Sequence, residues 1–236
     1  TNVLLGTSAG LGLTVETNNV AVGHSAMGHS DPQADRCVAI GGSSLNGNLT
    51  ADADGTVAIG YAAGNAMTDP ADAGEVSTFI GYQSGKANTV GSGHVAVGYE
   101  ALLTNVAGGR ATAIGFQALK VATKGSVVDT YNTAVGYKAG VALTSGTHNI
   151  FVGGRAGVGT TDVDKTVIVG VEAAEADMTT GADGTVAVGY RALQALTSGG
   201  GNVAIGYKAG ASITTANYNI AIGSGSLATM ATGNGS

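Results

Sequence analysis

A short repeat that closes on glycine dominates this sequence. The phrase Asn-Val-Ala-Val-Gly at residues 19–23 returns, lightly varied, along the whole chain. Most steps between successive glycines are 17 residues, and the others are 18, 19 or 21 residues. The repeat glycines are Gly6, Gly23, Gly41, Gly60, Gly81, Gly98, Gly115, Gly136, Gly153, Gly170, Gly189, Gly206 and Gly223. A unit this short, stacked many times, predicts one elongated repeat domain over residues 1–236.

Each repeat has the local chemistry of a β-strand. A β-branched residue, a small residue, a second β-branched residue and glycine follow one another, as in Val57-Ala58-Ile59-Gly60. This period of two favours strands, and a glycine in every repeat disfavours helices. We expect Val and Ile to face a core, and Ala and Gly to form a smooth face against a second layer or a sister chain. The predicted fold is an all-β parallel β-solenoid of about thirteen coils, associated side by side in a closed homo-oligomer.

Charge and composition exclude several partners. The net charge is −6, and the Lys and Arg residues are scattered singly, so no basic stripe could follow a nucleic-acid backbone. The longest apolar run, residues 167–171, is interrupted by Gly170 and is far shorter than the roughly 18 residues that span a bilayer. We therefore expect neither nucleic-acid binding nor membrane insertion by this segment. The single Cys37 precedes a strand motif and is interpreted as a substituted member of a repeated position.

Two further series of residues recur at fixed positions after the repeat glycines, and we call each series a column. Aromatic residues come directly after the glycine, at Tyr61, Tyr82, Tyr99, Phe116, Tyr137, Tyr190 and Tyr207. Charged residues come one position later, at Glu100, Lys138, Arg155, Glu172, Arg191 and Lys208. The aromatic column could stack bases or sugars, but we interpret it as packing against its own neighbours. Arg155, Glu172 and Arg191 could form an exposed charge ladder worth less than about 1 kcal/mol for each pair.

Acidic residues precede several strand motifs in similar phase. The calcium candidates are Asp52, Asp54, Asp162, Asp164 and Asp183. Carboxylates and turn carbonyls are suitable calcium ligands. However, the chain contains no calcium-binding nonapeptide repeat and no complete EF-hand loop, and Asp residues in turns readily accept local hydrogen bonds. We therefore predict a structural role and no resident cofactor.

The longer repeats mark insertions, at residues 46–55, 68–77, 120–131 and 176–184. Loops that protrude from a regular scaffold commonly carry binding sites, so these segments could contact a cell-surface receptor or a glycan. Tolerated surface variation is the alternative interpretation.

Catalysis finds little support in the sequence. His24, His29, His94 and His148 are not in matched phase with a nucleophile or a carboxylate set, and metal-ligand spacing is absent. Glu172, Glu175 and Asp177 could in principle cleave glycosides, but acids that are close in sequence are weak evidence. We predict that the chain is not an enzyme. An ice-binding threonine array is a further alternative, disfavoured by uneven repeat lengths, with candidates Thr68, Thr89, Thr123, Thr144, Thr161, Thr197 and Thr214.

The run Asn-Val-Ala-Ile-Gly-Tyr-Lys-Ala-Gly at 202–210, echoed at 132–140, resembles the head repeats of YadA-like trimeric autotransporter adhesins. It is also similar to Ala-Ile-Gly-Tyr-x-Ala-Gly repeats of phage tail fibres, and the resemblance covers essentially the whole chain. It implies parallel β-rolls, left-handed in the adhesin heads, packed as three chains about a fibre axis. That handedness departs from the usual crossover rule.

Two departures from the adhesin heads favour the viral version, because the period here is nearer 17 and tyrosine commonly follows the glycine. The resemblance therefore implies an extracellular structural and adhesive module, a homotrimeric segment of a phage tail fibre or virion appendage that supports host attachment. The head of a bacterial surface adhesin, binding host matrix or glycans, is the alternative. A polysaccharide-degrading tailspike is a third possibility.

Overall fold

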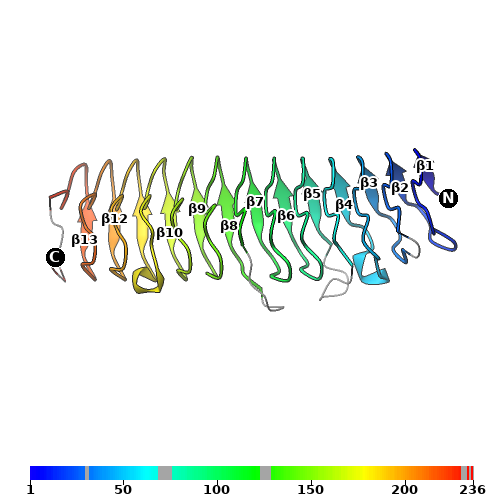
Figure 1. Cartoon of the computed structure of the whole chain (residues 1–236). Helices are drawn as coiled ribbons and strands as arrows, with labels where there is room; N and C mark the ends of the chain where they lie inside the picture. The colour runs from blue at the N-terminus through cyan, green and yellow to red at the C-terminus, as the bar shows by residue number, and fades with distance from the viewer. Residues whose placement is uncertain (30–31, 69–75, 123–128, 230–232, 234, 236) are drawn as a thin grey trace. The chain divides into compact units, whose positions relative to one another are not determined.

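The computed structural model describes residues 1–29, 32–68, 76–122, 129–229, 233 and 235. They belong to two compact units, the first comprising Thr1–Ile114 with Asp129, and the second Gly115–Ala122 with the chain from Thr130 onward. Within each unit, strands of successive coils lie side by side and parallel, with turns closing each coil (Figure 1). Each unit is thus a parallel β-solenoid, which confirms the predicted fold class.

Every strand within the described residues is three residues long. The first unit contains β1 (Val3–Leu5), β2 (Val20–Val22), β3 (Val38–Ile40), β4 (Val57–Ile59), β5 (Thr78–Ile80), β6 (Val95–Val97) and β7 (Thr112–Ile114). The second contains β8 (Thr133–Val135), β9 (Ile150–Val152), β10 (Val167–Val169), β11 (Val186–Val188), β12 (Val203–Ile205) and β13 (Ile220–Ile222). Two short 3₁₀ helices, η1 (Ala51–Ala53) and η2 (Thr180–Ala182), lie in longer coils. Pairing is in strict register, so that Ala187 lies beside Ala204.

The two faces of the strands are the reverse of the sequence-based prediction. The central residue of each strand from β2 to β13 is buried inside the coil, as Ala96 and Ala204 are, whereas the flanking Val and Ile side chains are half-buried or exposed. The expected Val/Ile core and the expected Ala/Gly association face are therefore both wrong. The chain bends toward the alanine side after each strand, and the narrow interior of the coil most often holds a small side chain there, with the buried Phe79, Phe151 and Ile168 as the larger ones.

The bend occurs at the repeat glycine, as its position in the motif predicts. Gly189, for example, has φ +131°, and an added Cβ would lie 2.5 Å from the carbonyl oxygen of Gly206 in the next coil. The N–H of Gly206 donates to the carbonyl of Val188 at 2.8 Å. Both the left-handed backbone and the close approach of successive coils therefore require glycine at this position.

The coil interior is completed by the residue four positions after the repeat glycine, which is most often Leu or Gly. Beside the alanine of β11, this position holds the fully buried Leu193. Beside the fully buried Phe151 of β9 it holds Gly157, where an added Cβ would lie 2.5 Å from the phenyl ring. Gly140 of the preceding coil also faces this ring, at 2.8 Å for its added Cβ. Large and small residues therefore compensate each other both within a coil and between neighbouring coils.

A buried polar column runs beside the strands, at the residue that precedes most of them. Asn149 shows the pattern: its Oδ1 accepts the N–H of Thr166 at 3.0 Å, and its Nδ2 donates to the carbonyl of Val163 at 2.7 Å. The predicted assignment of Cys37 to a repeated position is confirmed, since it occupies this column and its N–H donates to Asn19 Oδ1 at 2.8 Å. Burial raises the pKa of the Cys37 thiol to about 11, so the thiol stays protonated near neutral pH.

His94 occupies the same column in the first unit and reproduces the asparagine pattern with an imidazole. Its Nδ1 accepts the N–H of Ala111 at 3.2 Å, so the proton resides on Nε2, next to the Gly108 carbonyl. Asn105 Nδ2 donates to the same carbonyl at 2.9 Å. Burial lowers the pKa of His94 to about 4, although its backbone hydrogen bonds partly oppose that shift.

We expect this buried imidazole to make the first unit sensitive to acid. The unfolded chain takes up a proton near the ordinary His pKa of 6.5, whereas the folded chain resists protonation until about pH 4. Stability should therefore be intact above pH 6.5 and fall by about 3 kcal/mol as the pH drops to 4. Thermal unfolding at pH 7 and pH 4.5 tests this. The variant His94→Asn, which keeps the acceptor and the donor, should lose much of the acid sensitivity; equal pH dependence in both proteins would contradict the assignment.

Candidate functional site

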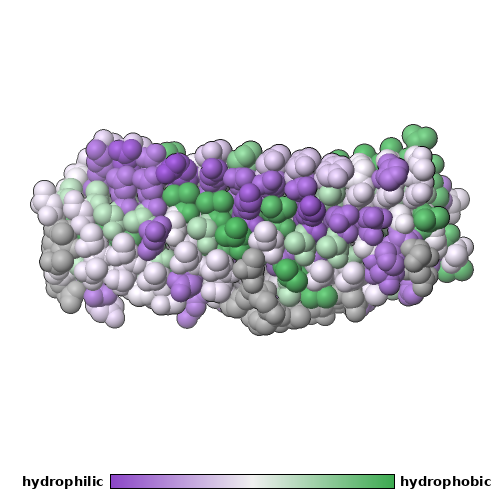
Figure 2. Space-filling model, in the orientation of Figure 1, coloured by the Kyte–Doolittle hydropathy of each residue, from purple (hydrophilic) through white to green (hydrophobic). Residues whose placement is uncertain are grey.

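The exposed apolar surface of the strands is the first candidate site. In both units the residues that flank the buried centre of each strand from β2 to β13 point away from the coil interior, and hydrophobic patches lie over the strands beside hydrophilic residues (Figure 2). We call the Val, Ile, Leu and Thr side chains at the first and third strand positions the strand stripe. Its best exposed members away from the terminal strands, 37–40% accessible, are Ile40, Val95, Ile114, Ile150 and Ile205. Repeated exposed apolar side chains of this kind are typical of an interaction surface.

The aromatic column stacks on itself, as predicted. In the first unit the rings of Tyr61 and Tyr82 lie 5.5 Å apart between centroids, and those of Tyr82 and Tyr99 lie 5.1 Å apart. The second unit contains a Phe116–Tyr137 stack at 5.4 Å and a Tyr190–Tyr207 stack at 5.5 Å. All seven aromatic residues remain exposed. They therefore join successive coils and at the same time form an aromatic surface.

The charged column makes ion pairs across successive coils of the second unit. Arg191 Nε donates to Glu172 Oε2 at 2.6 Å, which confirms that half of the predicted ladder. Arg155 instead reaches Glu175, at 2.5 Å between Nη2 and Oε1. Hydrogen bonding from Gln194 and then from Arg155 lowers the pKa of Glu175 against the opposing effect of burial. Glu172 raises the pKa of Arg191. Glu175 was missed in the predicted ladder because it lies outside the column.

The backbone carries this column in an unusual conformation. Lys138, Arg155 and Glu172 have φ between +54° and +61°. Residues other than glycine, Asn or Asp rarely adopt this left-handed region, at a cost of about 1 kcal/mol or more. The N–H of Arg155 donates to the carbonyl of Tyr137 in the preceding coil at 2.8 Å, and this contact repeats along the solenoid. Inter-coil hydrogen bonding thus holds the charged side chains at a fixed spacing.

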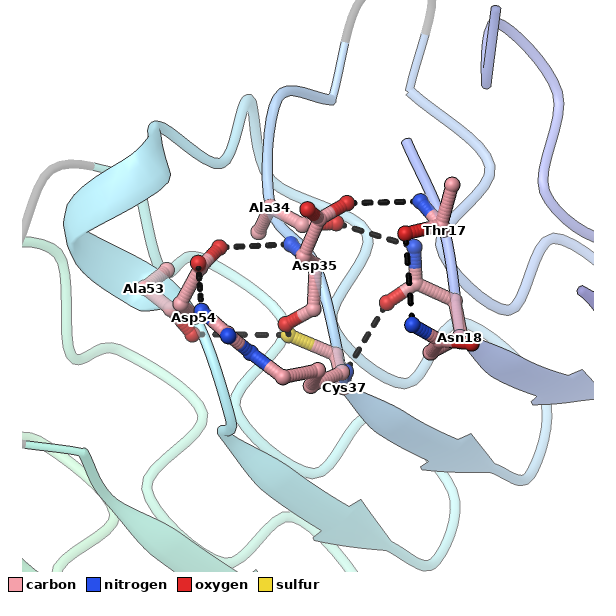
Figure 3. A network of polar contacts seen from close by, with 9 residues as sticks. Thr17, Asn18, Ala34, Asp35, Cys37, Ala53 and Asp54 are labelled. Atoms are coloured by element: carbon pink, nitrogen blue, oxygen red, sulfur yellow. Dashed lines mark hydrogen bonds and ion pairs between the residues drawn. The ribbon is translucent and has the colours of Figure 1, made fainter. Parts of the chain in front are cut away.

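Aspartates tie successive coils together. Asp35 Oδ1 accepts the N–H of Thr17 at 2.6 Å, and Asp54 Oδ1 accepts the N–H of Asp35 at 2.6 Å (Figure 3). Arg36 completes this network by an ion pair with Asp54 at 2.5 Å. The Sγ of Cys37 lies at its inner side, 3.4 Å from the carbonyl oxygen of Ala53.

The second unit repeats this arrangement at two of the calcium candidates. Asp164 Oδ1 accepts the N–H of Thr147 at 2.6 Å, and Asp183 Oδ1 accepts the N–H of Asp164 at 2.8 Å. Asp52 lies in η1, and Asp162 accepts the Thr161 hydroxyl at 3.2 Å. Over the described part of the chain, no three His, Cys, Asp or Glu side chains come together as a metal-binding group. The carboxylates of Asp54, Asp164 and Asp183 therefore have a visible structural use, as bonds to the preceding coil.

Two of the four predicted insertions are built alike. Residues 46–55 contain η1 and residues 176–184 contain η2, and in each the buried alanine is followed by Asp-Gly-Thr and the next strand. These insertions therefore return the chain to the common register. The central parts of the other two, residues 69–75 and 123–128, lie outside the described residues.

Several of the residues considered for catalysis have structural partners. His94 is buried in the polar column, and His148 packs against Tyr131 at 5.2 Å between ring centroids. Glu172 and Glu175 are engaged in the ion pairs described above. The absence of catalysis stays a prediction.

The threonine column uses its hydroxyl groups within the solenoid. Thr144 Oγ1 donates to the carbonyl of Thr161 at 2.9 Å, and Thr197 Oγ1 donates to that of Thr214 at 3.0 Å. The same pattern occurs at Thr89 in the first unit. Thr123 lies outside the described residues. These hydroxyl groups are tied to the next coil, which favours a structural role over an ordered ice-binding array.

The chain matches no known family model, no curated protein and no solved structure in the comparisons. Within the described residues there is no helix with the length and hydropathy to cross a bilayer.

Proposed function

We propose that this chain is a structural and adhesive module, a β-solenoid segment of a phage tail fibre or similar virion appendage that supports host attachment. The proposal places three copies side by side, with their strand stripes facing one another around a common axis. In this proposal the chain is extracellular, as part of the virion. The three-fold symmetry comes from the repeat resemblance at 132–140 and 202–210.

The observation that carries the proposal is the strand stripe. A short coil encloses little apolar volume, since the central strand position is most often alanine, while the larger Val and Ile side chains lie outside it. Burying such side chains against a sister chain is favourable by about 25 cal/mol per Å² of apolar surface. Because strand pairing keeps the coils of each unit in register, the same unit of an identical chain presents a matching stripe.

The oligomeric mass tests this proposal directly. Sedimentation equilibrium of the whole chain should give the mass of three 22.8 kDa chains. Ile205→Asp places a charge on the stripe and should produce the single-chain mass, because three desolvated carboxylates would meet at the axis. The circular dichroism signal of the strands should persist.

Ser212→Asp is the matched control, because it adds the same charge to an exposed turn of the same repeat. This variant should retain the mass of the assembly. A single-chain mass for the unaltered protein at micromolar concentration would contradict side-by-side association.

A further inference from the structure

The aromatic column has ends, and at those ends one ring face lacks an aromatic neighbour. Next to Tyr190 the column residue is Val171, whereas the column positions next to Tyr61, Tyr137 and Tyr207 are Gly42, Gly154 and Ser224 respectively. These three tyrosines are 51–54% exposed, whereas the other column rings are 37–43% exposed. The three tyrosines are therefore more exposed than the rings that have an aromatic neighbour on both sides.

Two of these ends are covered by the protein's own cations. Lys138 Nζ lies 5.3 Å from the centroid of the Tyr137 ring, and Lys208 Nζ lies 5.3 Å from that of Tyr207. The residue in the equivalent position after Tyr61 is Ala62, whose side chain is too short to cover a ring. The open face of Tyr61 is therefore the one of these three that no following cation occupies.

Gly42 has no side chain, so this coil places nothing in the space beside this face, which we call the slot. The N–H of Ala62 donates to the Gly42 carbonyl at 2.9 Å, and the N–H of Ser43 donates to the His24 carbonyl at 2.9 Å, so His24, Gly42 and Tyr61 belong to three successive coils. Coils are about 4.8 Å apart, so the missing side chain at Gly42 leaves space about one ring thick next to Tyr61. His24, in the coil beyond Gly42, is exposed.

We propose that this slot binds one pyranose ring of a neutral glycan, with a C–H face of the sugar against Tyr61. The negative face of a tyrosine ring attracts such weakly positive hydrogens. His24, Ser25 and Ser43 supply polar groups for the hydroxyl edges of the sugar. No charged residue occupies the charged-column position of these coils, which favours a neutral sugar over an acidic one.

The inference deepens the proposed attachment role and rests on it for the glycan being a cell-surface one. The slot lies beyond the bend at Gly60, past the end of the strand stripe, so it does not depend on stripe residues. Assembly and sugar binding can therefore be measured separately on the same protein.

Saturation-transfer NMR on the whole assembled chain tests the site, with the methyl glycosides of glucose, galactose and mannose as probes. At least one should receive saturation from the unaltered protein. Gly42→Tyr should abolish the transfer, because the new ring would continue the stack and fill the slot. Gly42 has no positive φ, and its added Cβ would lie 3.4 Å from the Tyr61 ring, so the backbone accepts this change. Tyr61→Ala should abolish it as well.

Gly154→Tyr is the matched control, since it adds the same side chain beside Tyr137, where an added Cβ meets no atom within 4 Å. It should leave saturation transfer unchanged. The proposal is overturned if no neutral glycoside binds, if indole or sialic acid binds in place of these sugars, or if Gly42→Tyr retains full transfer. An unchanged sedimentation mass in each variant would separate any of these failures from a failure of the fibre assembly.

Discussion

Gly189→Ala is expected to lower the thermal unfolding midpoint of the protein by about 10 °C. The methyl group would lie 2.5 Å from the Gly206 carbonyl oxygen, and the backbone at φ +131° is one that alanine rarely adopts. Neither conflict can be relieved locally, because Gly206 itself donates to Val188 at 2.8 Å and contacts the next coil in turn. Circular dichroism melts at equal protein concentration measure the shift.

Gly154→Ala is the internal control for this substitution, since it lies in the same unit but has no atom within 4 Å of an added Cβ and no positive φ. It should leave the midpoint unchanged or raise it slightly, by about 0.4–1 kcal/mol in stability, because the unfolded chain loses conformational freedom. Equal destabilisation by the two substitutions would show that close coil spacing does not explain the repeat glycine.

Phe151→Ala should destabilise the second unit by about 3–5 kcal/mol, because it removes a fully buried ring and leaves a cavity between coils. Gly157→Leu alone should also be severely destabilising, since its Cβ would lie 2.5 Å from that ring. Combining them recreates the Ala187 and Leu193 arrangement found elsewhere in the same unit. The double variant should therefore melt above either single variant.

This recovery is the informative result, since residues in contact commonly show coupling energies of 0.5 to about 3 kcal/mol. Thermal melts of the two single variants, the double variant and the unaltered chain make up the double-mutant cycle. Additive losses in the double variant would mean that the phenyl ring and the glycine are not size-matched partners.

The strands and their bends could be predicted because their signals are local. The Val-Ala-Val-Gly phrase fixes both the period and the phase, and Val20–Val22 is a strand as that phrase predicts. The direction of the bend is not contained in the alternation, and for this reason the assignment of the core to the Val and Ile face failed. Ala21 became interior because the chain turns toward its side at Gly23.

The stacked tyrosines and part of the charge ladder could also be predicted, since equal spacing in sequence becomes adjacency in a solenoid. The polar column was visible as a recurring Asn, yet its role depends on bonds to the next coil, such as Asn149 to Thr166. Arg155 pairs with Glu175 rather than Glu172 because the choice depends on side-chain reach. No sequence period distinguishes such alternatives.

The common register of the strands has a consequence for folding fidelity. If a growing solenoid skipped one repeat, nearly every backbone bond could reform with the wrong neighbour, since each repeat offers the same donors and acceptors. Phe151, between Gly140 and Gly157, breaks that equivalence. In a misaligned solenoid, a leucine placed opposite the phenyl ring would clash with it. A few bulky residues therefore disfavour misaligned repeats and select one order of assembly.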